Sequence, residues 1–149
     1  FAFVDRKSTS GFLYPRAWMA KRGLEPSTFF SDIVFAGDHE KLIELVASGR
    51  VDAGATSSSA YRITRTENPS MGALSILAKT GRIPYDAVVA SSRLAPGLVD
   101  KIRQALLGLS TRGEQGRRVL GGPTNINGFV PAEAELYDEV RRAQEALDQ

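Results

Sequence analysis

The chain opens on the stretch FAFVDRKSTSG, residues 1–11, and this stretch decides the fold. Four apolar residues at positions 1–4 predict a buried strand. The hydroxyl-rich run at 8–11 predicts a turn, and the residues from 12 to 21 predict a helix. A strand, a turn and a helix in this order are typical of an α/β fold.

The turn has the chemistry of a site for a small oxyanion. Ser8, Thr9 and Ser10 supply three hydroxyls, the first amides of a helix lack partners, and the helix dipole adds partial positive charge. A serine or threonine that only caps a helix would leave the same pattern. The turn is therefore a candidate anion site that needs support from the rest of the chain.

Length and composition are those of an ordinary globular protein. With 149 residues, 42% hydrophobic and 24% charged, the chain can bury a core. Nineteen Lys and Arg against seventeen Asp and Glu leave a formal charge of +2 without a basic run, so no nucleic-acid partner is predicted. Cysteine is absent, which excludes disulfides, thiolate catalysis and thiolate metal sites.

Apolar and amphipathic segments alternate further along, as in a mainly parallel sheet flanked by helices. Strands are predicted at 32–36 and 51–56, and a helix between them begins after Asp38 and is closed by Gly49. The polar run at 56–59 predicts a loop after the third strand. Because the carboxyl ends of parallel strands meet at one edge of a sheet, the three loops are expected to converge.

The second half of the chain is predicted to be mostly helical. Strands are predicted at 74–78 and 87–90, and apolar spacing predicts a helix over 98–109 and a shorter helix after Gly113. A last helix is expected to begin at Pro131 and to carry the apolar stripe Leu136, Val140, Ala143 and Leu147. These stripes are expected to be covered by a sheet outside this sequence, in a longer chain or in a partner.

Several segments together resemble a known family. The residues at 4–15, FAGDHE at 35–40, GRVDAGA at 49–55 and IPYD at 83–86 are similar, in order and spacing, to ABC-transporter substrate-binding proteins of the phosphonate and phosphate type. The resemblance extends to residues 128–130 and 137–141. It covers most of the chain but only the latter half of such a protein.

The resemblance implies a two-lobed periplasmic-binding fold of type II. Residues 1–80 would form the second lobe, residues 81–86 a hinge or crossover, and residues 87–149 the helical C-terminal return into the first lobe, whose opening half would be absent. The implied function is capture of a small phosphorus oxyanion by lobe closure. The implied partner is a membrane permease, and the implied location is periplasmic or extracellular, with or without a lipid anchor.

The resemblance also assigns site residues. Ser8, Thr9 and Ser10 match the residues that grip the phosphonate oxygens in the family, and Gly11, which closes their turn, is expected to contact the ligand with them. His39 is the sole histidine and matches the family's histidine ligand of the same anion. From the residues alone, His39 would equally suit a solvated helix start.

Two further positions bear on the organic part of the ligand. Asp86 matches an acidic position that faces an amine in aminophosphonate binders, and fixing a turn after Pro84 is its alternative role. Ser59 departs from the pattern, because those binders place a glutamate there. Losing a buried charged partner costs about 2–5 kcal/mol. The sequence therefore disfavours an amine-bearing phosphonate and favours phosphate, phosphite, a small neutral alkylphosphonate or another tetrahedral oxyanion.

Catalysis is not predicted, nor is a cofactor or a metal. A catalytic triad needs a nucleophile, a base and an orienting acid, and one histidine beside a helix start gives little support for such a triad. The sequence also lacks the metalloprotease, phosphate-loop and dinucleotide-binding patterns. Two other binding functions stay open. One is a sensory input domain of a regulator or receptor with the same fold, and the other is a binding protein for a sulfonate or a thiamine precursor.

Overall fold

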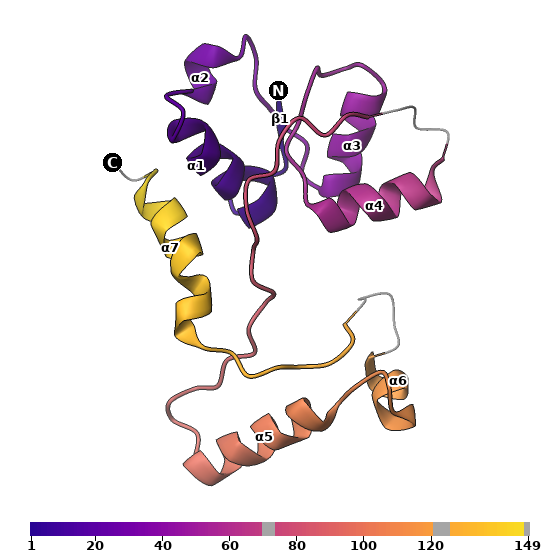
Figure 1. The fold of residues 1–149 in the computed structure, drawn as a ribbon, viewed down its shortest axis with the longest axis vertical. Helices are drawn as coiled ribbons and strands as arrows, with labels where there is room; N and C mark the ends of the chain where they lie inside the picture. The colour runs from indigo at the N-terminus through magenta and orange to yellow at the C-terminus, as the bar shows by residue number, and fades with distance from the viewer. Residues whose placement is uncertain (70–73, 121–125, 148–149) are drawn as a thin grey trace. The chain divides into compact units, whose positions relative to one another are not determined.

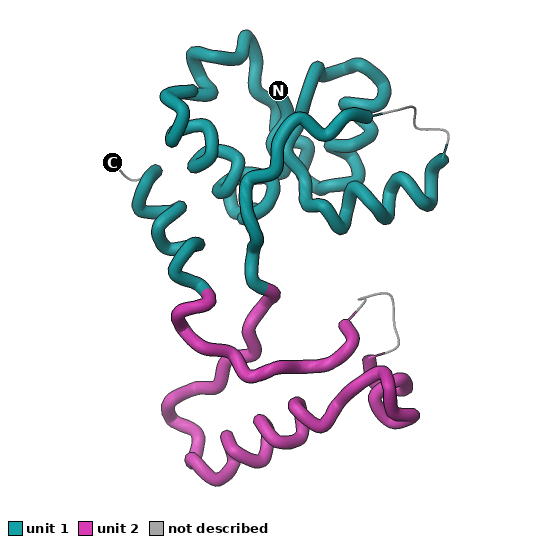
Figure 2. Tube along the Cα trace, viewed as in Figure 1, with its two compact units in different colours: residues 1–84, 137–149 teal, residues 85–136 magenta. Residues whose placement is uncertain are grey.

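The computed structural model describes residues 1–69, 74–120 and 126–147 (Figure 1). The chain forms two compact units, shown in different colours in Figure 2. Unit 1 comprises residues 1–84 and 137–149, and Unit 2 comprises residues 85–136. The chain first passes from Unit 1 to Unit 2 inside the stretch marked as a crossover at 81–86. Residues 137–149, which the sequence analysis assigned to the C-terminal return, belong to Unit 1.

A short parallel sheet lies at the centre of Unit 1. Strand β1, Ala2–Phe3, pairs in parallel with β2, Val34–Phe35, with Ala2 opposite Val34. Ala2 also forms a parallel bridge with Gly54, whose two neighbours exchange hydrogen bonds of 2.9 and 3.0 Å with Ala2. The segment β1 therefore lies between the other two, which confirms the predicted parallel α/β arrangement.

The third strand, predicted at 51–56, is reduced to that single bridge. The close approach at the bridge needs a glycine, because a Cβ on Gly54 would lie 2.7 Å from Leu42 Cδ2 and 3.2 Å from the Ala2 carbonyl oxygen. The neighbouring strand β1 is only two residues long and has few further groups to offer. The chain at 51–56 therefore runs beside β1 without forming a longer ladder.

The first helix begins earlier than the predicted range of 12–21. A π-helical turn, η1, spans Thr9–Leu13, and α1 follows directly over Tyr14–Ala20. Pro15 has no N–H to donate to the carbonyl of Gly11, so an ordinary α-helical turn would lack that bond. The Gly11 carbonyl instead accepts the Val4 N–H at 3.2 Å, which ties the turn to the end of β1.

Two helices follow the other strand-like segments. Helix α3, His39–Ala47, is capped by Asp38, whose carboxylate accepts an amide of the first turn at 2.7 Å, and this helix confirms the prediction. Helix α4, Ser58–Glu67, shows that the loop predicted at 56–59 was wrong for Ser58 and Ser59, while residues 56 and 57 are irregular as predicted. Ser57 caps α4 by accepting an amide at 3.1 Å, and a small polar run in a sequence is equally compatible with a cap and with a loop.

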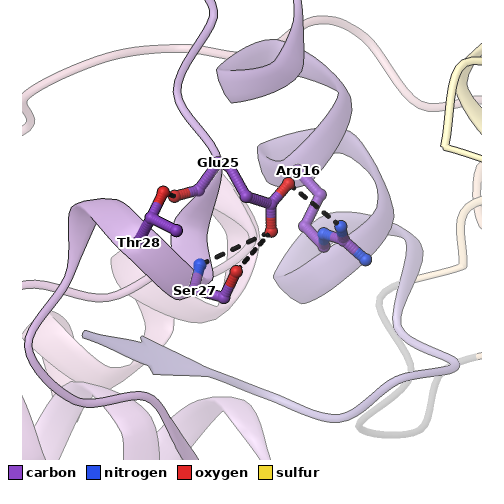
Figure 3. A network of polar contacts seen from close by, with 4 residues as sticks. All are labelled: Arg16, Glu25, Ser27 and Thr28. Atoms are coloured by element: carbon purple, nitrogen blue, oxygen red, sulfur yellow. Dashed lines mark hydrogen bonds and ion pairs between the residues drawn. The ribbon is translucent and has the colours of Figure 1, made fainter.

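A carboxylate fixes the start of the one-turn helix α2, Pro26–Phe29, which the sequence analysis did not predict (Figure 3). Glu25 accepts the Ser27 hydroxyl at 3.0 Å and the Ser27 N–H at 3.5 Å, while its own carbonyl accepts the Thr28 hydroxyl at 3.1 Å. The Glu25 carboxylate also lies 3.8 Å from the Arg16 guanidinium of α1. This ion pair is partly exposed, so it adds less stability than the capping bonds.

An apolar cluster around the sheet holds the first part of Unit 1 together. Leu42 of α3 is 1% exposed and packs with Ala2, Val4 and Ala36. Burying these side chains between one helix and the strands is the usual core of an α/β unit. This packing positions the start of α3 against the ends of β1 and β2.

A second cluster joins α1 to the C-terminal helix α7, Asp138–Glu145. Tyr14 and Ala17 of α1 pack against Ala143, and Val140 lies against the same cluster. The prediction that this stripe would need a sheet outside the sequence was therefore wrong for Val140 and Ala143. The start predicted at Pro131 was also wrong.

The stretch before α7 explains the late start. A 3₁₀ turn, η2, spans Ala134–Tyr137, and α7 begins only after it. Leu136 in this turn is 53% exposed, so it does not share the buried face of the helix. Proline can open a helix but cannot by itself propagate one, and the chain from 131 to 133 is irregular.

Unit 2 contains two helices that the sequence predicted, α5 at Pro96–Gly108 and α6 at Glu114–Leu120. An antiparallel bridge joins Ser110 to Gly128. Large apolar side chains stay open to solvent, with Tyr85 96% and Val130 81% exposed. Among the residues described in this unit, no large apolar side chain is buried, and the cover expected from outside the sequence stays a prediction.

The strands predicted at 74–78 and 87–90 are not formed, and these predictions were wrong. Leu77 is 83% and Val89 86% exposed. A strand needs hydrogen-bonding neighbours, and no segment in the described part of the chain pairs with either run. Across the described ranges, no helix combines the length and the apolar character needed to cross a bilayer.

Candidate functional site

Three loops follow the carboxyl ends of the strand-like segments, and their side chains meet at His39. The Ser10 hydroxyl, after β1, lies 3.4 Å from His39 Nε2. The Thr56 hydroxyl, after the bridge at Gly54, lies 2.9 Å from His39 Nδ1. His39 itself is the first residue of α3, after β2. The structure thus brings together the three loops that the sequence analysis expected to converge.

Ser8 and Gly11 shape the turn. The Ser8 hydroxyl oxygen accepts the Gly11 N–H at 2.9 Å, so the capping role left open by the sequence is present. Its O–H hydrogen can still be donated to a ligand. Gly11 is buried, and a Cβ there would lie 2.4 Å from Val4 Cγ2. Gly11 therefore has a packing role, and its contact with a ligand stays a prediction.

Thr9 and Ser10 occupy the first two positions of η1, and both are half-buried. Amides in the first turn of a helix have no partner within it, so their N–H groups can serve a ligand beside their hydroxyls. The contact from Ser10 to His39 adds an imidazole to these donors. The turn and the histidine together form a compact set of hydrogen-bond donors.

The half-buried position of His39 makes its neutral form more favourable. Burial lowers the pKa of His39 from its ordinary value of 6.5, while the carboxylates of Asp38 and Asp5 act in the opposite direction. The backbone N–H of Ser57 donates to Nδ1 at 3.4 Å. Near pH 7 the imidazole is therefore mainly uncharged, and it has polar partners on both ring nitrogens.

Ser59 and Asp86 lie outside this set of direct contacts. Ser59 is an exposed residue in the first turn of α4, and its hydroxyl lies 3.1 Å from that of Ser57. Ser59 therefore connects to His39 through Ser57. Asp86 is exposed and belongs to Unit 2, whereas the other predicted site residues belong to Unit 1. Its role stays a prediction.

Sequence reasoning missed Thr56 and Ser57 as partners of His39. The available signal was their place directly after the third strand-like segment, where a parallel sheet presents its ligands. Ser59 is the site residue predicted from this polar run, whereas the contacts with His39 come from Thr56 and Ser57. Which member of such a run faces the histidine depends on where α4 begins.

The donors at the site suit an anion. Hydroxyls, free amides and an imidazole N–H are the groups with which proteins replace the hydration shell of an oxyanion. Over residues 1–69, 74–120 and 126–147, no three His, Cys, Asp or Glu side chains gather as a metal site would require.

Comparison with known sequences gives a family match over nearly the whole chain. Residues 1–137 match the family model described as ABC transporter, phosphonate, periplasmic substrate-binding protein. The chain is 32% identical over 109 residues to the phosphate-import protein PhnD of Mycolicibacterium smegmatis, which covers 68% of this chain and 34% of that protein. It is 26% identical over 154 residues to the probable ABC transporter phosphite binding protein PhnD1 of Prochlorococcus marinus, covering 99% of this chain and 52% of that protein.

Comparison with solved structures gives the same fold. PhnD1 from Prochlorococcus marinus, solved in complex with methylphosphonate, matches with a TM-score of 0.74 at 24% identity. The match covers 99% of this chain and 56% of that one. The chain therefore has the expected type II periplasmic-binding fold, and it spans about half the length, or less, of the relatives it matches.

Proposed function

This chain belongs to the family of phosphonate-type periplasmic substrate-binding proteins of ABC transporters, and on that premise we propose that it binds a small phosphorus oxyanion at residues 8–11 and His39. The family's role is substrate binding, which is not catalysis. The observation that carries the proposal is the distance of 3.4 Å between Ser10 Oγ and His39 Nε2. It joins the hydroxyl-rich turn to the only histidine of the chain.

The proposed mechanism of binding is exchange of water for fixed protein donors. The hydroxyls of Ser8, Thr9 and Ser10 and the free amides of the turn would each donate to an anion oxygen, and the N–H of His39 would add one more bond. Donors already held in place by capping and packing need little reordering when the anion enters. Hydrogen bonds to a charged group are also stronger than those between neutral groups.

The ligand we propose is phosphate, phosphite or an alkylphosphonate whose alkyl group is small and uncharged. Phosphate, phosphite and methylphosphonate occur in the names of the relatives, and each offers the tetrahedral oxygens that the turn suits. Ser59 supplies a hydroxyl where a glutamate would neutralise an ammonium group. One acidic partner, Asp86, would remain for such a group. Aminoethylphosphonate is therefore the disfavoured ligand.

The wider setting follows from the family and is part of the proposal. Residues 1–80 would act as the second lobe, residues 81–86 as a hinge and residues 87–136 as the return into the first lobe, while α7 packs on α1 in Unit 1. Closure about the hinge would present the loaded protein to a membrane permease. We place the protein in the periplasm or outside the cell, with or without a lipid anchor.

Titration calorimetry of the complete protein tests the proposal. Phosphate, phosphite, methylphosphonate and 2-aminoethylphosphonate are titrated separately, and at least one of the first three is expected to bind more tightly than the last. Ser10→Ala and Thr9→Ala are each expected to weaken that binding about tenfold or more, since hydrogen bonds to charged groups contribute roughly 1.5–3 kcal/mol.

Ser48→Ala serves as the matched control. Ser48 lies at the C-terminal end of α3, opposite His39, and its hydroxyl donates to the Glu44 carbonyl at 2.8 Å. This variant is expected to bind like the wild type. Equal affinities in wild type, Ser10→Ala and Thr9→Ala would refute the oxyanion site, and tight binding of aminoethylphosphonate would refute the argument from Ser59.

A further inference from the structure

We propose that Thr56 is a positioning residue for His39. Its hydroxyl donates to Nδ1 and, together with the Ser57 N–H, holds the imidazole in the tautomer that carries its proton on Nε2, beside Ser10. The expected effect of Thr56 on anion binding rests on the proposed function. The tautomer itself can be measured without any ligand.

The backbone amide of Ser57 fixes which ring nitrogen is the acceptor. Its N–H donates to His39 Nδ1 at 3.4 Å, and an amide N–H has no acceptor capacity. A neutral imidazole carries one hydrogen and one lone pair, so a lone pair on Nδ1 leaves the hydrogen on Nε2. The partners of the ring thus assign its tautomer.

The Thr56 hydroxyl is the closer partner of the same nitrogen. It lies 2.9 Å from Nδ1, well within the range of a good hydrogen bond. A hydroxyl can donate or accept, but a nitrogen without a hydrogen can only accept. The Thr56 O–H therefore donates, and this bond fixes the orientation of the ring more firmly than the longer amide contact.

The second ring nitrogen, Nε2, shows why this orientation matters. Nε2 lies 3.4 Å from Ser10 Oγ, so the N–H that this tautomer carries on Nε2 lies beside the turn, where it can be donated to an oxygen of a bound anion. A series of hydrogen bonds then connects the Thr56 hydroxyl, the imidazole and the ligand. Hydrogen bonds in such a chain strengthen one another.

The surroundings of His39 agree with a neutral donor. Protonation would place a second hydrogen on Nδ1, the nitrogen to which the Ser57 N–H and the Thr56 hydroxyl donate. The bond from the Ser57 N–H would then be lost, because a protonated nitrogen cannot accept it. Burial disfavours the charged ring as well, and Asp38 and Asp5 oppose burial only in part, because the pKa of His39 is lowered overall. The ring is thus held as a single N–H donor.

Nuclear magnetic resonance of the imidazole nitrogens tests the tautomer directly. The complete ¹⁵N-labelled protein is recorded near pH 7.5, and His39→Gln identifies the signals of this ring by their loss. The wild type is expected to show a protonated Nε2 and an unprotonated, hydrogen-bonded Nδ1. In Thr56→Val, which keeps the branched shape, the Nδ1 signal is expected to move toward that of an unbonded acceptor.

Thr56→Ser restores the hydroxyl and is expected to restore the wild-type spectrum. If Thr56→Val does not fold, Thr56→Ala replaces it with the same expectation. A wild-type spectrum with the proton on Nδ1 would overturn the inference. An Nδ1 signal that does not respond to the loss of the Thr56 hydroxyl would overturn it too.

Binding of inorganic phosphate, phosphite and methylphosphonate then tests the positioning role. For whichever of them the wild type binds, Thr56→Val is expected to weaken binding about three- to tenfold, the range set by the loss of one ordinary hydrogen bond, and Thr56→Ser to stay within about twofold. Unchanged affinity in Thr56→Val would overturn the positioning role. Failure of the wild type to bind any of the three would refute the proposed function instead, and the spectra would still decide the tautomer.

Discussion

The imidazole Nε2 of His39 lies 3.4 Å from the hydroxyl of Ser10, although 29 positions separate the two residues in the chain. The fold brings them together because β1 and β2 are parallel neighbours whose carboxyl ends meet at one edge. Ser10 and His39 can therefore act on one ligand oxygen or on adjacent ones. This relationship predicts that their contributions to binding depend on each other.

A double-mutant cycle measures that dependence. Ser10→Ala and His39→Gln are each expected to weaken oxyanion binding, and the double variant is expected to lose less than the product of the two single effects. The coupling should lie within about 0.5–3 kcal/mol, as found for residues in contact. Calorimetry on the four proteins at one pH gives the cycle, and strictly additive losses would contradict a shared site.

Replacing Gly11 by alanine is expected to disrupt the turn. The new Cβ would lie 2.4 Å from Val4 Cγ2 and 2.6 Å from Val4 Cβ, so either the turn or the end of β1 must shift. Overpacking of this kind costs about 1–3 kcal/mol of stability. Urea unfolding measures the loss, and weaker oxyanion binding should accompany it.

Gly97→Ala is the control for Gly11→Ala. A Cβ at Gly97 meets no atom within 4 Å, and the residue lies in the first turn of α5. Its stability is expected to stay within about 0.5 kcal/mol of the wild type. Equal effects of the two substitutions would show that the close contact with Val4 does not hold in solution.

Tyr14→Phe is expected to stabilise the protein. The side chain is 6% exposed, and its hydroxyl has no hydrogen-bond partner among the residues that the structure describes. Burial raises the pKa of Tyr14, Glu139 raises it further, and Arg142 lowers it in part. Removing an unpaired buried hydroxyl should add about 1 kcal/mol to the free energy of unfolding.

Tyr61→Phe provides the opposite case. The Tyr61 hydroxyl donates to the Leu74 carbonyl at 3.0 Å, so its removal is expected to cost about 1 kcal/mol. Thermal or urea unfolding of the two variants gives the comparison. A destabilised Tyr14→Phe would mean that the Tyr14 hydroxyl has a partner in solution.

The lowered pKa of His39 predicts a pH dependence of stability. Between its folded value and the ordinary value of about 6.5, the unfolded state binds more protons, so stability rises with pH in that window. Without ligand, the protein should therefore lose stability as the pH falls below about 6.5. His39→Gln should remove this part of the slope.

Unfolding free energies at several pH values, in buffer free of phosphate, check this prediction. The difference in slope between wild type and His39→Gln isolates the contribution of the histidine. An identical slope in the variant would contradict the lowered pKa.

Local patterns predicted the parts of the fold that local chemistry determines. Asp38 caps α3 and Pro96 opens α5, and both helices lie where the spacing of apolar residues indicated. The meeting of the three loops followed from the rule that parallel strands end at one edge. The side chains in the turn could therefore be selected before the fold was known.

Features that depend on a distant partner were less predictable. The apolar run at 74–78 has the composition of a strand, but a strand forms only beside another one. Thr56 was overlooked for a related reason, since its role depends on His39, which is 17 positions away. In both cases the composition of the segment was recognised, while its neighbour in space could not be derived from the segment itself.

The order of the two units along the chain has a consequence for the intact molecule. Unit 2 is inserted between residues 84 and 137 of Unit 1, and α7 returns to pack on α1 through Tyr14, Ala17 and Ala143. A protease that cuts within the insertion would therefore divide the polypeptide into two pieces, and the last helix would stay packed on α1. Two fragments expressed apart could reassemble through the same apolar surfaces, so covalent continuity and structural integrity are distinct properties of this protein.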